Sequence, residues 1–127
     1  MIILNIDTSD NNFILLSLDL PKKITRKRKI QAYRQQSEKL LSAIAKLLAD
    51  NKLSPKDISK IRVEHRGSSF TSLRIGVLCA NALAYALGIE IETIVPDKKY
   101  LKKLKNFSLV LPKYSRDPDI KIASNKI

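Results

Sequence analysis

The sequence predicts an α/β domain in which one sheet packs against two long helices. Apolar residues alternate at period two in some segments and recur at helical spacing in others. All three glycines fall within one strand–loop–helix–strand unit: Gly67 in the loop, Gly76 in the first turns of the helix and Gly88 where a left-handed C-cap is needed. With 127 residues, the chain suits one hydrophobic core and is too short for two ordinary domains.

The N-terminal third reads as three strands. Residues 1–7 predict a short buried strand, residues 10–12 a turn, and residues 13–20 a second strand that pairs with the first. Residues 22–34 hold several basic and β-branched residues but no acid, which predicts a third strand at the sheet edge. Its Arg26, Lys27, Arg28 and Lys29 have two interpretations: protection of a free edge against aggregation, or contact with a polyanion such as RNA.

Two segments predict helices. The first begins near Ser37 and carries Leu40, Leu41 and Ile44, and the second covers residues 70–87. Leu73, Val77, Ala80 and Ala84 form a coiled-coil-like seam on the second helix, beside a narrow polar stripe that includes Asn81. Both helices are more apolar than one sheet can cover. The eight residues just named are therefore the predicted partner-binding set, although some could prove to be core.

The remaining segments complete the predicted domain of residues 1–95. Residues 58–65 predict a fourth strand and residues 89–95 a fifth. Residues 96–111 form a basic segment whose end, residues 107–111, could be a last strand, and residues 112–127 read as an extended or mobile tail.

Composition restricts the possible chemistry. The net charge of +12 suits work beside nucleic acid or an acidic partner. A single cysteine, Cys79, argues against a disulfide framework, and with one histidine the sequence predicts neither a metal site nor a cofactor. No uncharged apolar run is long enough to predict a membrane span, so we expect a cytoplasmic protein.

Two polar motifs have catalytic and structural interpretations. Asp7-Thr8-Ser9 after the first strand could grip phosphate or a metal, but an Asx turn explains it equally directly. His65 and Ser69 could belong to a hydrolase, yet no orienting acid is evident and no nucleophile-elbow pattern surrounds the serine.

Four motifs resemble one known family. They are Ile-Leu-Asn-Ile-Asp-Thr-Ser at 3–9, Gln-Ser-Glu-Lys-Leu-Leu at 36–41, Ser-Ser-Phe-Thr-Ser-Leu-Arg-Ile-Gly at 68–76, and Pro-Lys-Tyr-Ser-Arg at 112–116 with Pro118. They are similar to motifs of the bacterial TsaB (YeaZ) family of tRNA threonylcarbamoyladenosine biosynthesis proteins. The family-motif residues on the predicted loop and helix start are Asp7, Thr8, Ser69, Phe70, Thr71, Arg74 and Gly76.

The chain also departs from the family pattern. Two family glycines are replaced by Ser68 and Ser72, and Gln36 stands where the family has histidine. The family's second lobe is apparently missing, because the fifth predicted strand runs almost directly into the closing motif.

The resemblance implies an actin-like, ribonuclease-H-like lobe with a mixed five-stranded sheet in the order 3-2-1-4-5. It implies a noncatalytic scaffold that pairs through its two helices with TsaD, the subunit that transfers the threonylcarbamoyl group to adenosine 37 of certain tRNAs. The ATPase TsaE is the third component that the family implies.

Alternatives to the scaffold are a stand-alone basic tRNA-binding or RNA-binding module, a homodimer formed through the same helices, and a hydrolase using Ser69 and His65. If the seam of the second helix is an interface, Ala80→Arg should abolish partner binding and leave the fold intact, whereas an unfolded variant would place Ala80 in the core.

Overall fold

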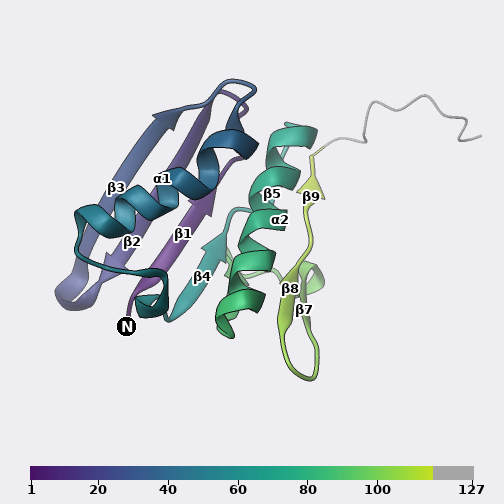
Figure 1. Ribbon diagram of the computed structural model, residues 1–127. Coiled ribbons are helices and arrows are strands. Elements are labelled where there is room, and N and C mark those ends of the chain that lie inside the picture. The colour runs from purple at the N-terminus through teal and green to yellow at the C-terminus, as the bar shows by residue number, and fades with distance from the viewer. Residues whose placement is uncertain (116–127) are drawn as a thin grey trace, which may run out of the picture.

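A five-stranded mixed sheet forms the centre of the computed structural model, which describes residues 1–115 (Figure 1). The strand order is β3-β2-β1-β4-β6. These strands are β1 (Ile3–Asp7), β2 (Phe13–Leu20), β3 (Ile24–Gln31), β4 (Lys60–Val63) and β6 (Glu90–Thr93). β1, β2 and β3 form an antiparallel meander, while β4 is parallel to both β1 and β6. The predicted order is confirmed, because β6 is the fifth strand of this sheet.

One face of the sheet carries the core. Alternate residues of β1 and β2 point to that face, so Leu4 and Ile6 lie beside Leu16 and Leu18. The opposite face is polar: Lys60 and Arg62 of β4 bind Glu92 of β6 through ion pairs of 2.8 and 3.1 Å. This alternation is expected where helices cover only one side of a sheet.

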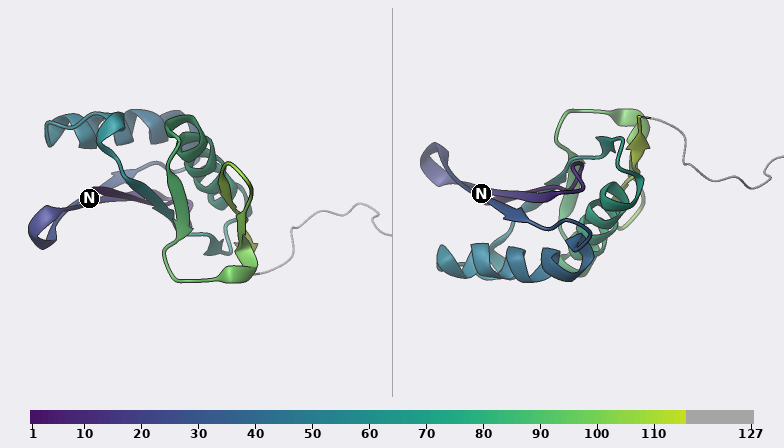
Figure 2. Two further views of the ribbon diagram at one scale, coloured as in Figure 1. Left: turned by 90° about the horizontal axis from the view of Figure 1, so that it is seen from below. Right: turned by 90° about the horizontal axis from the view of Figure 1, so that it is seen from above.

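Both long helices cover the apolar face (Figure 2). α1 (Gln36–Asp50) packs over β2 and α2 (Phe70–Leu87) packs over β4, with the two helices in contact. α1 begins at Gln36, one residue before the predicted start. α2 has the predicted bounds and ends at Gly88, whose φ of 67° is the left-handed conformation that glycine adopts without strain.

Two smaller strand pairs follow the sheet. β7 (Leu101–Lys103) and β8 (Ser108–Val110) form a hairpin against α2 and β6. β5 (Arg66–Gly67) pairs in parallel with β9 (Lys113–Tyr114). Short 3-10 turns occupy Pro21–Lys23, Pro55–Asp57 and Lys98–Tyr100.

The structure corrects some predicted boundaries. The third, fourth and fifth strands are each shorter at both ends than predicted, and the basic segment contains a strand of its own, β7. The expectation of an extended or mobile tail is wrong for Lys113 and Tyr114, which form β9. The remainder of that prediction, residues 116–127, lies outside the described part of the chain. Residues 96–111 pack on the same core as the preceding domain, because Val110 is fully buried there.

α2 is long and apolar enough to cross a membrane by length and composition alone. In this fold it packs along the sheet, with Leu73, Val77 and Ala80 buried. A core helix with little charge passes the same test, which explains its composition without a membrane.

Candidate functional site

The four sequence motifs converge at one end of the sheet, where β1 and β4 end and α2 begins. Thr8 follows β1 and is buried against α2, where its hydroxyl donates a 2.6 Å hydrogen bond to the Ser72 carbonyl. Gly76 makes this approach possible, since a Cβ at that position would overlap the Thr8 hydroxyl oxygen. The first and third motifs therefore meet in a contact that requires a glycine on the helix.

The other two motifs brace the same end. The buried Gln36 amide of the second motif donates a 2.6 Å hydrogen bond to the Asn11 carbonyl and so fixes the turn between β1 and β2. Tyr114 of the closing motif stacks at 4.3 Å on Phe70, and the Arg74 guanidinium lies 5.6 Å from the Phe70 ring. The family-motif residues thus lie together, and the contacts that they make are structural ones.

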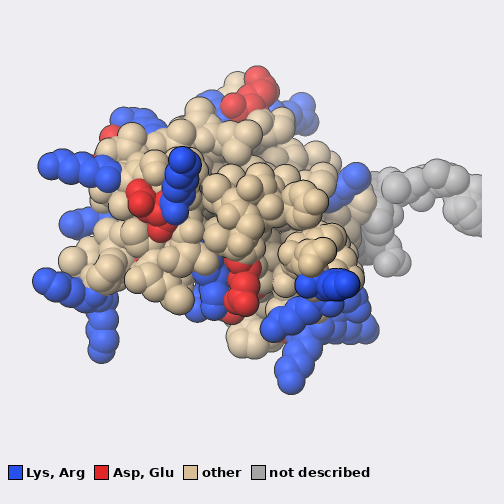
Figure 3. Space-filling model, turned by 60° about the horizontal axis from the view of Figure 1, so that its bottom comes forward, with Lys and Arg blue, Asp and Glu red and all other residues tan. Residues whose placement is uncertain are grey.

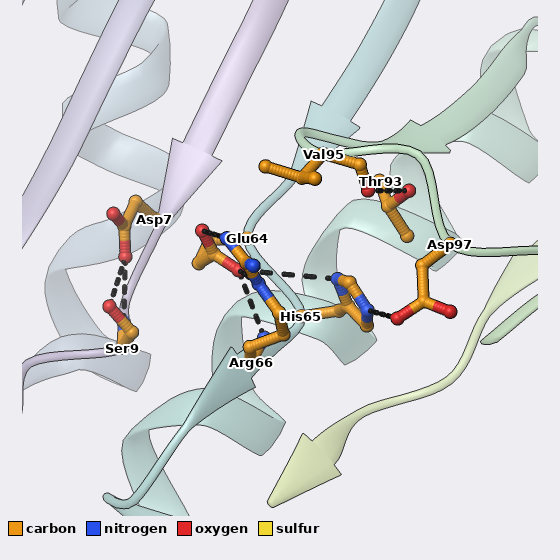
Figure 4. A network of polar contacts seen from close by, with 8 residues as sticks. All are labelled: Asp7, Ser9, Glu64, His65, Arg66, Thr93, Val95 and Asp97. Carbon is orange, nitrogen blue, oxygen red and sulfur yellow. Dashed lines mark hydrogen bonds and ion pairs between the residues drawn. The ribbon is translucent and has the colours of Figure 1, made fainter. Parts of the chain in front are cut away.

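The Asp7-Thr8-Ser9 segment has the geometry of an Asx turn (Figure 4). Asp7 Oδ1 accepts hydrogen bonds from the Ser9 backbone N–H at 2.9 Å and from its hydroxyl at 2.6 Å. Within residues 1–115, no group of three or more His, Cys, Asp or Glu residues is placed to hold a metal ion. The geometry is that of the structural interpretation of this motif.

A polar hollow of about 880 Å³ opens beside these motifs. Its lining is rich in hydroxyl and amide side chains and lies between the starts of the two helices: Ser9, Asp10, Asn11, Arg34, Gln36, Ser37, Ser68, Ser69, Phe70, Thr71, Ser72 and Ile75. Ser69 is already engaged, because its hydroxyl accepts a short hydrogen bond from Ser72.

His65 is fully buried and lies between two carboxylates, as Figure 4 shows. Its Nε2 is 2.9 Å from Asp97 Oδ2, whereas Nδ1 is 4.0 Å from Glu64 and has no hydrogen-bond partner among the described residues. An ionised carboxylate can only accept, so Nε2 carries the proton shared with Asp97. The hydrogen bond from His65 is the main cause that lowers the pKa of Asp97.

This network corrects the expectation that His65 has no orienting acid. Asp97 supplies one, from a loop 32 residues away in sequence. The His65 carbonyl also accepts a 2.6 Å hydrogen bond from Lys113, so the histidine ties β4 to both Asp97 and β9. Burial raises the pKa of Glu64, but the hydrogen bonds from Arg66 outweigh burial and hold it below its ordinary value.

The partner-binding set predicted from the helices is mostly core. Leu40, Ile44, Leu73, Val77, Ala80 and Ala84 are each at most 4% exposed and pack within the protein's own core. The Asn81 side chain bonds both backbone groups of Val110, each at 2.8 Å. Ala80→Arg should therefore unfold the domain, which is the core outcome of that test.

Leu41 alone of that set is highly exposed, at 61%, and it marks a different face. It faces Leu78 of α2, which is 63% exposed, across an apolar groove of about 490 Å³. The groove is lined without a single charge by Ser37, Leu40, Leu41, Ile75, Leu78, Cys79, Ala82 and Leu83. Sequence reasoning missed it because α2 is apolar nearly all round, so periodicity could not separate its buried side from its exposed one.

The predicted basic cluster on β3 is divided by the strand's pleat. Arg26 and Arg28 pair with the core-facing Leu18 and Leu16, whereas Lys27 and Lys29 stand on the opposite face. Arg28 also forms a 2.9 Å ion pair with Asp50 at the end of α1. These four charges do not form one surface.

The sequence matches known proteins over much of its length. A family model described as TsaD: tRNA N6-adenosine threonylcarbamoyltransferase matches residues 30–95. The Bacillus subtilis (strain 168) tRNA threonylcarbamoyladenosine biosynthesis protein TsaB is 35% identical over 96 residues, which cover 74% of this chain and 41% of that protein. The chain thus spans about two fifths of the length of this curated relative.

Solved structures show the same fold. YeaZ from Pseudomonas aeruginosa has a TM-score of 0.68 and 22% identity, over 73% of this chain and 43% of that one. A second structure, described as an uncharacterized protein with similarity to peptidase YEAZ from Pseudomonas aeruginosa, gives the same score and identity over 42% of its chain. The expected actin-like, ribonuclease-H-like lobe is confirmed by this likeness.

Proposed function

The chain belongs to the TsaB (YeaZ) family, and we propose that it serves tRNA threonylcarbamoyladenosine synthesis as a noncatalytic scaffold that pairs with TsaD. The observation that carries this proposal is the uncharged groove between α1 and α2. Leu41 and Leu78 are large apolar side chains left mostly exposed on facing helices. Apolar area of this kind gains stability when a partner removes it from water.

The family match supports TsaD as the occupant of the groove. The segment that matches the TsaD model, residues 30–95, contains α1, β4, α2 and β6. A protein described by that model shares this segment and therefore carries an equivalent pair of helices. Two such pairs can pack face to face around a pseudo-two-fold axis, with each helix pair filling the other's groove.

The polar end of the molecule supports a scaffold more than a catalyst. The His65 ring is buried and held by Asp97, and the Ser69 hydroxyl is bonded to Ser72. A hydrolase would need these two groups to face a substrate and each other. Their hydrogen bonds instead stabilise the loop that precedes α2.

The remaining parts of the proposal follow from the family. TsaE is the expected third component, tRNA is met through the complex, and the cytoplasm is the expected location. A stand-alone basic RNA-binding module is the alternative, and a homodimer through the same groove is a competing outcome of the test below.

The test is co-expression with the cognate TsaD followed by size-exclusion chromatography with light scattering. We expect a one-to-one heterodimer with the natural sequence. Leu78→Arg places an unpaired charge in the groove and should weaken pairing by about 3 kcal/mol or more, roughly 100-fold or more. Leu104→Arg is the matched control, because it makes the same change at a 51% exposed leucine outside the groove.

Each result has a clear meaning. Loss of the heterodimer with Leu78→Arg alone, in a protein that keeps its circular dichroism spectrum, supports the groove as the docking surface. Equal pairing by both variants would place TsaD elsewhere, and a stable dimer of the chain with itself that excludes TsaD would replace the proposal with a homodimer.

A further inference from the structure

We propose that the β7–β8 hairpin and the turn before it form a second surface, which binds the phosphate backbone of RNA. The choice of RNA among polyanions rests on the proposed function in tRNA modification, whereas the surface itself is defined by the structure. We call residues 98–113 the lysine hairpin. It lies apart from the groove, on the side of α2 that faces β8 (Figure 1).

The lysine hairpin concentrates positive charge without nearby neutralisation. Five of the eight residues from 98 to 105 are lysine, and all five are exposed. Asp97 is the only acid between residues 96 and 115, and it is occupied by His65. Among the described residues, none of these ion pairs involves Lys98, Lys99, Lys102, Lys103, Lys105 or Lys113. Figure 3 shows basic side chains gathered at the lower right of the surface, apart from those at the left.

The hairpin holds these lysines on a fixed frame. Leu101 and Val110 are paired across the two strands and pack on the core, while Asn81 of α2 holds both backbone groups of Val110. The loop is closed by a 2.7 Å hydrogen bond from Leu104 to Phe107. A rigid frame lowers the entropy lost on binding, so the charges are presented in advance.

Aromatic rings lie beside the charges. Tyr85 of α2 is 66% exposed and meets Phe107 edge to face at 5.1 Å. The two rings and Lys103 line a hollow of about 340 Å³, and Glu90 is the one acid in its lining. Lysines that bind phosphates next to rings that can stack on bases are typical of RNA-binding surfaces.

β3 is equally basic but lacks these features. Its charges are split between two faces, Arg28 is paired with Asp50, and the Lys29 ammonium lies 4.0 Å from the Phe13 ring. Protection of the free sheet edge explains these residues without a ligand. This contrast makes β3 a matched control for the hairpin.

A membrane surface fits the hairpin less well than RNA does. Leu104 is the large apolar residue that stands well exposed in the loop, whereas Leu101 and Phe107 are partly buried. Binding to a membrane interface needs a broader apolar face than one leucine. Anionic vesicles are therefore included in the test.

The test measures binding of the full chain to a tRNA transcript by fluorescence anisotropy over a series of salt concentrations. One variant carries Lys102→Gln, Lys103→Gln and Lys105→Gln. The control carries Arg26→Gln, Lys27→Gln and Lys29→Gln, which removes the same amount of charge from β3. Matching thermal melts check that both variants are folded.

We expect the hairpin variant to bind tRNA roughly 10-fold to 100-fold more weakly near physiological salt, with a log–log salt slope lower by about 2 to 3. The β3 control should lose about threefold or less. Equal losses in the two variants, no tRNA binding by the natural chain, or tighter binding to phosphatidylserine vesicles than to tRNA would each overturn the inference.

Pairing with TsaD separates this inference from the proposed function. The hairpin variant leaves the groove intact and should still form the heterodimer, whereas Leu78→Arg should keep its tRNA affinity. A chain that never pairs with TsaD but loses tRNA affinity with the hairpin lysines would refute the scaffold and leave the RNA surface standing.

Discussion

Gly76→Ala tests the contact that joins β1 to α2. A Cβ on Gly76 would overlap the Thr8 hydroxyl oxygen and lie 3.1 Å from both Thr8 Cβ and Cγ2. Thr8 is buried and cannot turn away without losing its 2.6 Å hydrogen bond to Ser72. The added methyl group must therefore displace either Thr8 or the helix.

The magnitude follows from three opposing contributions. Crowding a packed contact destabilises by about 1–3 kcal/mol. Loss of the Thr8 hydrogen bond removes about 1 kcal/mol more. Alanine returns about 1 kcal/mol, because it is a better helix former than glycine. The net expectation is a loss of about 2 kcal/mol, or a melting temperature lower by roughly 7 °C for a chain of this size.

A double-mutant cycle with Thr8→Ala isolates the cause. Urea unfolding followed by circular dichroism gives the free energy of unfolding for each variant. In the Thr8→Ala background the obstructing hydroxyl and methyl groups are absent, so Gly76→Ala should be close to neutral. The coupling energy between the two positions should be about 2 kcal/mol.

Gly88→Ala provides the matched glycine control. Nothing lies within 4 Å of a Cβ at Gly88, but its φ of 67° strains any other residue. We expect a loss of about 1 kcal/mol whether or not Thr8 is present. If Gly76→Ala also costs the same in both Thr8 backgrounds, the steric argument is refuted.

Three further predictions concern single side chains. Asn81→Leu should destabilise by about 2 kcal/mol, because it strips Val110 of both backbone partners, and should speed amide exchange in the hairpin. The hydrogen bond from His65 lowers the pKa of Asp97, so its contribution to stability is complete above the ordinary value of 3.8 and is lost as pH falls through the lowered pKa; urea midpoints across that range should show the difference between Asp97→Asn and the natural chain shrinking in acid. Burial raises the pKa of Cys79, so iodoacetamide should alkylate it more slowly than a free thiol, and more slowly still in the TsaD complex.

Controls make these results specific. Ser42→Ala changes a polar residue on the exposed side of α1 and should leave hairpin exchange unchanged. Asp57→Asn serves the acid series, since it alters a carboxylate far from His65 in a separate turn. For the thiol, equal alkylation rates with and without TsaD would mean that the groove stays open in the complex.

Local patterns were sufficient for the elements and their order. The alternation in residues 13–20 and the glycine at the end of residues 70–87 are local signals, and each predicts an element from spacing and backbone conformation alone. The four motifs were sufficient for the family because their spacing along the chain is itself the evidence. No long-range contact was needed for either result.

The two faces of α2 needed the tertiary structure. Ala80 and Ala82 are equally apolar in sequence, yet Ala80 is fully buried against the sheet while Ala82 lines the open groove. A helix that is apolar on all sides gives no moment from which to choose its buried face. Only the positions of the sheet and of α1 decide it.

Contacts between distant segments were equally invisible in the sequence. Asp97 approaches His65, and Asn81 approaches Val110, because β6 runs beside β4 and the hairpin folds back on α2. By itself the sequence determined the elements, the strand order through the family resemblance, and the family. The tertiary structure decided which apolar residues are left for a partner and which lysines share a surface, because exposure depends on what packs nearby and not on the residue type.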